Sequence, residues 1–142
     1  VSVFSARAIT PPATLADLAA ARFSVCTQSG TLFEELVEKY EGITVKSLSD
    51  IAEIVLEVEH RRSDVGLLDS DTVRVLGAFH PALHVYTIPL LPAERIDGYG
   101  IGIAPANEAL RREVQAAVEQ MRADGTMDRL MIRWFGAKDT ER

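Results

Sequence analysis

The sequence predicts an α/β fold in which helices flank a mainly parallel sheet. Apolar segments of strand length alternate with amphipathic helical segments along most of the 142 residues. One segment, residues 64–69 (DVGLLD), is almost continuously apolar, which is typical of a strand buried on both faces of a parallel sheet. No internal repeat interrupts the alternation, and the length of the chain suits one domain.

Strands are predicted where β-branched and aromatic residues gather between turn residues. Such segments occur along the whole chain and end at glycines, prolines or polar clusters. The six predicted strands are residues 1–9, 22–27, 43–46, 64–69, 82–91 and 98–104.

The first four helices are predicted from a capping residue followed by apolar residues at helical spacing. In the first two helices, an acidic residue three positions after a threonine completes a capping-box pattern. The four expected capping residues are Thr14, Thr31, Ser49 and Asp71.

Two further helices are predicted near the C-terminal end of the sequence. Asn107 caps a long amphipathic helix that ends at Gly125, and Thr126 begins the second helix. We expect four apolar side chains of this last helix to be buried in the core: Met127, Leu130, Met131 and Trp134.

The composition favours an ordinary acidic surface. The chain is 47% hydrophobic and 25% charged, with a formal net charge of −6. Nucleic acids and anionic membranes attract basic faces, so binding to either is not expected. The longest apolar stretches fall far short of the ~20 residues that span a bilayer, and no signal peptide is visible.

Catalytic and metal-binding patterns are not found. The single cysteine, Cys26, excludes an internal disulfide and a multi-cysteine zinc site, and its place in a predicted strand is typical of a small core residue. His60, His80 and His84 lack metal-ligand spacing, because Pro81 separates the last two. Without a G-x-S-x-G elbow or an obvious Ser/His/Asp set, we expect no catalytic residue, no metal and no cofactor.

Two junctions between a strand and a helix are candidate ligand sites. In residues 28–31 (QSGT), a glycine turn precedes a helix, so free N–H groups beside the hydroxyls of Ser29 and Thr31 suit a carboxylate or phosphate. Simple capping by Thr31 explains the same pattern. Asp69 follows a predicted parallel strand, where ligands of open α/β sheets bind. It could hold an ammonium group, or it could cap the next helix together with its two neighbours.

The C-terminal segment carries the most specific resemblance to a known family. Residues 99–136 read YGIGIAPANEALRREVQAAVEQMRADGTMDRLMIRWFG and closely resemble the C-terminal segment of the family 3 extracellular solute-binding proteins. These are type II periplasmic binding proteins that mostly recognise amino acids. Residues 13–40 resemble the segment that enters their second lobe, and residues 58–70 resemble the later strand with its acidic ligand-binding residue.

The resemblance implies a chain that lacks the N-terminal part of the first lobe. Residues 1–97 would form the second, ligand-binding lobe with its entry hinge strand. Residues 98–142 would form a return strand and two helices, packed in the same domain or on a partner subunit. Carried over by position, the contacts to the ligand carboxylate and α-ammonium fall on Gln28, Ser29, Gly30, Thr31 and Asp69.

One departure from the family concerns the end of the third predicted helix. Many relatives have a glycine where this chain has Arg61. An arginine there must adopt a less favourable turn than glycine would, or the helix must end differently.

The function implied by the resemblance is that of a solute-binding module rather than an enzyme. We expect a periplasmic protein of an amino-acid ABC transporter, with a membrane permease among its partners. It would bind an amino-acid-like ligand weakly, or as part of a larger assembly such as a homodimer or a complex with a missing-lobe partner. The alternatives are a dimerising interaction or sensor domain with a lapsed pocket and, less favoured, a cyclohexadienyl dehydratase-like enzyme.

Overall fold

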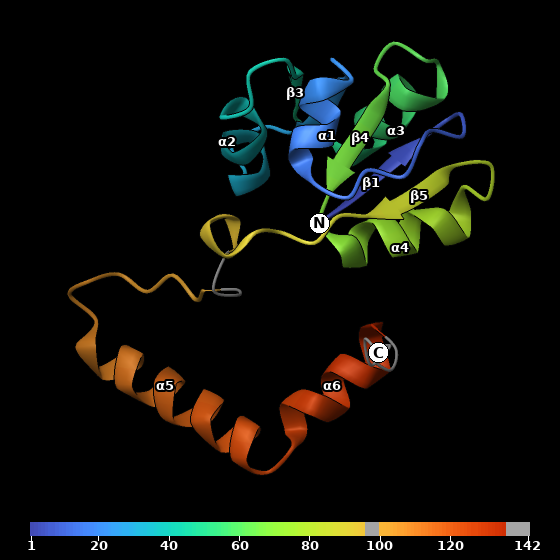
Figure 1. The fold of residues 1–142 in the computed structure, drawn as a ribbon. Helices are drawn as coiled ribbons and strands as arrows, with labels where there is room; N and C mark the ends of the chain where they lie inside the picture. Colours follow the sequence, from blue (N-terminus) through green and yellow to red (C-terminus); the bar gives the residue numbers. More distant parts are fainter. Residues whose placement is uncertain (96–99, 136–142) are drawn as a thin grey trace. The chain divides into compact units, whose positions relative to one another are not determined.

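The chain divides into two compact units, Val1–Ile96 and Asp97–Arg142. The computed structural model describes residues 1–95 and 100–135, and Figure 1 shows the elements of each unit. The first unit contains a sheet and the helices that cover it. The described part of the second unit contains two helices.

The sheet of the first unit has five strands in the order β3-β2-β4-β1-β5. β2 pairs in parallel with both β3 and β4, whereas β1 lies antiparallel between β4 and β5. Four strands therefore run in one direction, so the predicted mainly parallel sheet is confirmed, with β1 as the exception. The strands are β1 (Ser2–Ser5), β2 (Ser24–Gln28), β3 (Thr44–Leu48), β4 (Val65–Leu68) and β5 (His84–Thr87).

Helices cover both faces of this sheet. Leucines and valines of α1 and α2 pack with Val3 and Val25 in one core, and apolar residues of α3 and α4 pack with Phe4 and Cys26 in the other. Neighbouring residues of β1, β2 and β4 thus point into opposite cores, as the period of a strand requires. The helices are α1 (Leu15–Ala20), α2 (Leu32–Glu38), α3 (Ile51–Glu59) and α4 (Ser70–Phe79), followed by the 3₁₀ turn η1 (Pro92–Glu94).

The core between the sheet and α3 is tightly packed around β1 and β4. A Cβ placed on Gly66 would lie 2.3 Å from the ring of Phe4, so this position admits only glycine. Cys26 is fully buried in the same core, and burial raises the pKa of its thiol to about 11. It is a core residue, as its place in a strand predicts.

Helix capping agrees with the sequence at two helices and differs at two others. Thr14 and Thr31 are the N-cap residues of α1 and α2, as predicted. The predictions of Ser49 and Asp71 are wrong, because Asp50 caps α3 and Asp69 caps α4. Asp50 lies two residues after the end of β3, and Asp69 lies directly after the end of β4. Both already have the extended backbone of an N-cap, so the carboxylate of each accepts a free amide at the start of its helix.

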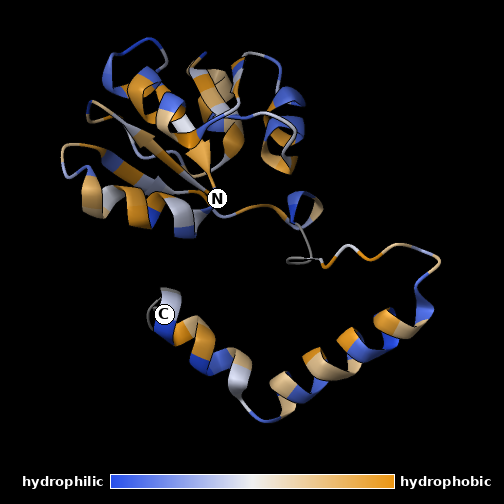
Figure 2. Ribbon diagram, turned by 180° about the vertical axis from the view of Figure 1, so that it is seen from behind, coloured by the Kyte–Doolittle hydropathy of each residue, from blue (hydrophilic) through white to orange (hydrophobic). Residues whose placement is uncertain are grey.

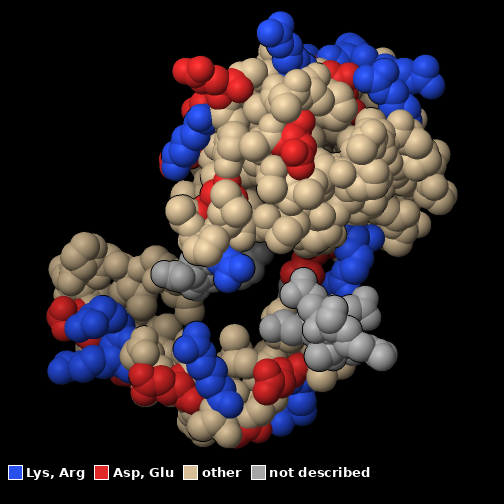
Figure 3. All heavy atoms as spheres, in the orientation of Figure 1, with Lys and Arg blue, Asp and Glu red and all other residues tan. Residues whose placement is uncertain are grey.

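The helices of the described part of the second unit are α5 (Glu108–Ala123) and α6 (Thr126–Phe135), which meet at Gly125. Asn107 caps α5 by accepting the amide of Leu110, and Gly125 has a φ of +74°, so both predicted helix boundaries are confirmed. Figure 2 shows apolar and polar bands alternating along both helices. Figure 3 shows charged side chains of both signs over them. No helix in the described ranges has the length and apolar character needed to cross a bilayer.

Two predictions for this part of the chain are wrong. Residues 100–104 form no strand, and residues 98–99 of the predicted strand lie outside the described residues. The side chains expected in the core are not buried either: Met127 is half-buried, Leu130 and Met131 are 37% exposed, and Trp134 is 68% exposed. A strand requires a pairing partner and an apolar stripe requires a covering surface. Within the described part of the second unit, no strand is present to pair with residues 100–104, and each helix has only the other to pack against.

Candidate functional site

The predicted site residues gather at the end of the sheet where β2 and β4 finish. Gln28 is the last residue of β2, and Asp69 directly follows β4. Because β2 and β4 are parallel neighbours in register at Val25 and Val65, the two segments leave the sheet at the same edge. This is the edge at which open α/β sheets bind ligands.

The QSGT turn is fastened to its surroundings by polar contacts. The amide of Ser29 donates to the carbonyl of Leu48, at the end of β3, at 2.8 Å. The hydroxyl of Thr31 donates to the carbonyl of Gln28 at 2.7 Å and accepts the amide of Glu34 at 3.4 Å. The capping interpretation of Thr31 is therefore correct for its hydroxyl, while its backbone amide has no hydrogen-bond partner among the described residues.

Gly30 provides an exposed donor in this turn. Its φ of +72° lies in the region that favours glycine, and an added Cβ would meet no atom within 4 Å. Its amide donates to Oε2 of Glu34 at 2.7 Å. The nearby Ser47 hydroxyl, and then this amide, hold the pKa of Glu34 below its ordinary value. The turn thus already holds one carboxylate, which belongs to the chain itself.

Asp69 caps α4 and remains partly exposed. Its Oδ1 accepts the amide of Thr72 at 2.8 Å, so the capping interpretation of this residue is also correct. Its second carboxylate oxygen makes no hydrogen bond within the described part of the chain. One oxygen is thus committed to the helix, and the other is available to a cation.

A small cluster of hydroxyls lies beside Asp69 and was not predicted from the sequence. Ser2 donates to Oγ of Ser70 at 3.0 Å and lies 3.2 Å from Oγ1 of Thr87. Ser2 reaches this edge because β1 inserts between β4 and β5 in the reverse direction. No local pattern in the sequence indicates that insertion, so no signal could have placed Ser2 here.

The electrostatic character of this edge comes from helix ends. α2, α3 and α4 all begin here, at Thr31, Asp50 and Asp69. The N-terminal end of a helix carries a partial positive charge and unpaired amides, which favour an anion. Two of the three caps are aspartates, so carboxylates also line the edge. An edge with both characters suits a ligand that carries both an anionic and a cationic group.

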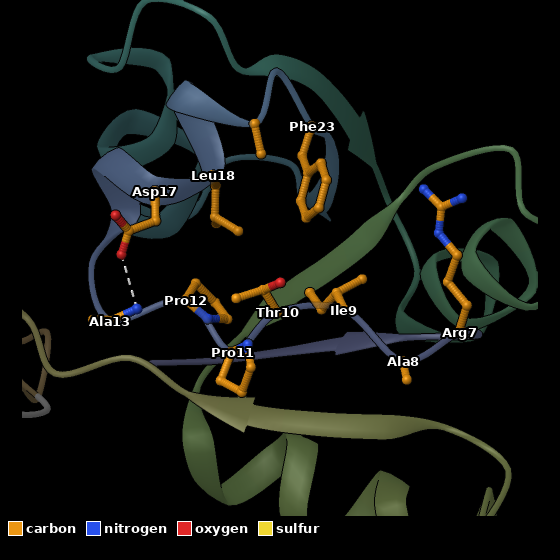
Figure 4. Close-up of a pocket in the computed structure, with 11 residues that line it drawn as sticks. Arg7, Ala8, Ile9, Thr10, Pro11, Pro12, Ala13, Asp17, Leu18 and Phe23 are labelled. Atoms are coloured by element: carbon orange, nitrogen blue, oxygen red, sulfur yellow. Dashed lines mark hydrogen bonds between the residues drawn. The ribbon is translucent and has the colours of Figure 1, made fainter.

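A hollow of about 630 Å³ lies in another part of the first unit, between residues 7–13, α1 and Phe23 (Figure 4). Its charged groups are already engaged within the chain. The carboxylate of Asp17 accepts the amide of Ala13 at 2.8 Å, and Arg7 pairs with Asp64 at 2.6 Å. None of the predicted ligand contacts lines this hollow. In the described ranges, no group of three or more His, Cys, Asp or Glu side chains is arranged to hold a metal ion.

The fold is that of the type II periplasmic binding proteins. The P235GK mutant of ArgBP from T. maritima superposes with a TM-score of 0.80 at 28% identity, covering 96% of this chain and 57% of that one. Domain 2 of TmArgBP superposes with a TM-score of 0.57 at 30% identity, covering 63% of this chain and 98% of that domain. No family model matches the sequence.

Sequence similarity leads to the same family. The chain is 32% identical over 111 residues to the protein described as "Probable ABC transporter arginine-binding protein ArtJ" from Chlamydia trachomatis serovar D. The match covers 78% of this chain and 43% of that protein, so the chain spans less than half the length of this curated relative. The chain is a homologue of the solute-binding proteins of amino-acid ABC transporters, as its sequence predicts.

Proposed function

We propose that this chain is a solute-binding module that holds an amino-acid-like ligand at the edge formed by the QSGT turn and Asp69. The observation that carries the proposal is the meeting of two segments about forty residues apart at the ends of neighbouring parallel strands. The proposed contact residues are Gln28, Ser29, Gly30, Thr31 and Asp69.

The chemistry of this edge matches the two charged groups of a free amino acid. Amides in the turn, at the exposed Gly30 and the half-buried Thr31, can donate to the ligand carboxylate. The carboxylate oxygen of Asp69 that does not cap α4 can accept the α-ammonium. The site requires only binding, and its proposed role is not enzymatic.

Arginine is the first ligand to test. The curated relative and the T. maritima structures carry names of arginine-binding proteins. We place the module outside the cytoplasmic membrane, where it would deliver its ligand to a membrane permease. Both assignments rest on the relatives.

Binding by this chain alone should be weak. One edge leaves most of the ligand in water, where each hydrogen bond contributes less than in a closed site. High affinity would need a second surface, from a homodimer partner or from another chain that supplies the missing lobe. We therefore expect a millimolar rather than a micromolar dissociation constant for the isolated chain.

An NMR titration of the chain with arginine tests the proposal. We expect saturable amide shifts at residues 28–31 and 69–72. Asp69→Asn retains a good N-cap while removing the charge that faces the ammonium, so it should weaken binding about tenfold without unfolding α4. Asp71→Asn is the matched control, because Asp71 pairs with Arg74 and belongs to no proposed contact. Equal affinities of the two variants would contradict the role of Asp69.

A second candidate, a dimerising interaction or sensor domain with a lapsed pocket, is favoured by one observation. α6 exposes Ile132 (58%) and Trp134 (68%), and large apolar side chains in such positions often mark an interaction surface. Sedimentation equilibrium over a range of concentrations, with and without arginine, separates the two functions. Ligand-independent self-association together with no arginine binding would favour this second function.

A further inference from the structure

We propose that the carboxylate of Glu34 accepts the hydrogen bond of the Gly30 amide when no ligand is bound. The carboxylate of an incoming amino acid must then displace it from this amide. The inference rests on the proposed function, since it concerns the regulation of the same site. Glu34 would then set the affinity of the site as an internal competitor.

The contact between the two residues is well formed. Oε2 of Glu34 lies 2.7 Å from the amide nitrogen of Gly30, within the usual range for a donor paired with a carboxylate. Gly30 is exposed, and an added Cβ there would have open space around it. The same amide is therefore accessible to a carboxylate that arrives from solution.

The geometry differs from that of an ordinary capping box. In a capping box, the acidic residue at the third helical position bonds back to the amide of the N-cap residue itself. Here the N-cap residue is Thr31, and its amide has no partner among the described residues. Glu34 instead reaches one residue further, to Gly30. The hydrogen bond between Glu34 and Gly30 is therefore not needed to cap α2.

An internal competitor lowers the apparent affinity for a ligand. Only molecules in which Glu34 has released Gly30 can offer this amide, so the measured dissociation constant equals the intrinsic one divided by the fraction of molecules in which the amide is free. Truncating Glu34 should therefore strengthen the binding of a carboxylate ligand. This is opposite to the effect expected if Glu34 contacted the ligand directly.

The experiment compares Glu34→Ala with Glu35→Ala in NMR titrations of the whole chain. Both variants lose one negative charge from α2, but Glu35 is exposed and makes no hydrogen bond through its side chain to a described residue. Arginine is the carboxylate ligand, and agmatine, which lacks the carboxylate, is the matched ligand. We expect arginine to bind about three- to tenfold more tightly to Glu34→Ala than to Glu35→Ala. Agmatine should show no such gain.

Each outcome has a distinct meaning. If the parent chain binds arginine and Glu34→Ala binds it equally or more weakly, the competition is overturned and the proposed function stands. If no chain shows saturable shifts with arginine, the proposed function fails and the inference fails with it. The contact has its own readout, because the Gly30 amide shift should follow the acid titration of Glu34 and stop doing so in Glu34→Gln. A Gly30 shift that ignores pH in the parent chain would overturn the contact.

Discussion

The two units of this protein have similar helical patterns and different packing. In the first unit, apolar residues of four helices are buried against the two faces of a sheet. In the second unit, α5 and α6 have equally regular apolar residues, yet Leu110, Ile132 and Trp134 remain exposed among the described residues. An amphipathic pattern therefore predicts a helix and the face that seeks burial. It does not predict that a covering surface exists.

The largest expected difference between the units concerns their aromatic residues. Phe4 is fully buried beside Gly66, so Phe4→Ala should lower the free energy of unfolding by about 4 kcal/mol. Trp134→Ala should change it by less than about 0.5 kcal/mol, because most of that side chain is already in water. Urea denaturation of both variants measures the difference. A large loss for Trp134→Ala would mean that this side chain is covered in solution.

A smaller difference is expected for carboxylates. Glu57 is 4% exposed and pairs with Lys46 at 2.5 Å and with Arg62 at 2.9 Å, whereas Glu108 pairs with Arg111 on the exposed surface of α5. The hydrogen bond from Lys46 is the main cause that lowers the pKa of Glu57 below its ordinary 4.5. The folded state therefore binds a proton to Glu57 less readily than the unfolded chain does. Its contribution to stability is present above about pH 4.5 and is lost as the pH falls through the lowered pKa.

Thermal unfolding between pH 7 and pH 3 tests this contribution. The Glu57→Gln variant should be less stable than the parent chain at pH 7. It should also lose less stability than the parent chain as the pH falls. Glu108→Gln should leave both quantities almost unchanged, since exposed ion pairs contribute little. Identical pH profiles for Glu57→Gln and the parent chain would show that Glu57 is not the group responsible.

The smallest expected effect is a gain at the end of a helix. Arg61 has a φ of +57° after α3, as the departure from the family pattern predicts, while Gly125 occupies the same left-handed region after α5. Arg61→Gly should raise the free energy of unfolding by about 0.5 kcal/mol, because glycine adopts this conformation without crowding at Cβ. Arg74→Gly, inside α4, should lower it by about 1 kcal/mol. A loss of stability in Arg61→Gly would indicate that the arginine side chain makes a stabilising contact.

The parts of the fold that could be predicted depend on contacts between near neighbours. Alternation of strands and helices, the caps at Thr14, Thr31 and Asn107, and the turn at Gly125 all follow from residues a few positions apart. The observed caps of α3 and α4 differ from the predicted ones by one residue and by two residues, because several polar residues at each junction are suitable caps. Only the path of the chain out of the strand selects between them.

The candidate site was predicted as two separate segments. Local residue types indicated that residues 28–31 suit an anion and that Asp69 suits a cation. The contact between Glu34 and Gly30 was not foreseen, although the capping pattern pointed to Glu34, because its carboxylate reaches one residue further than the usual motif. Whether these residues bind a ligand stays a prediction for the titrations above.

Short-range physical chemistry thus accounts for the helices, the strands and the chemical character of each turn, since turn conformation, capping and apolar periodicity act within a few residues. The order of the strands, the reversed insertion of β1, and the meeting of Gln28, Asp69 and Ser2 at one edge come from long-range pairing. The burial of Phe4 and the exposure of Trp134 likewise depend on long-range contacts. The reason is that pairing and burial depend on which surfaces the folded chain brings together, and no local pattern records the partner.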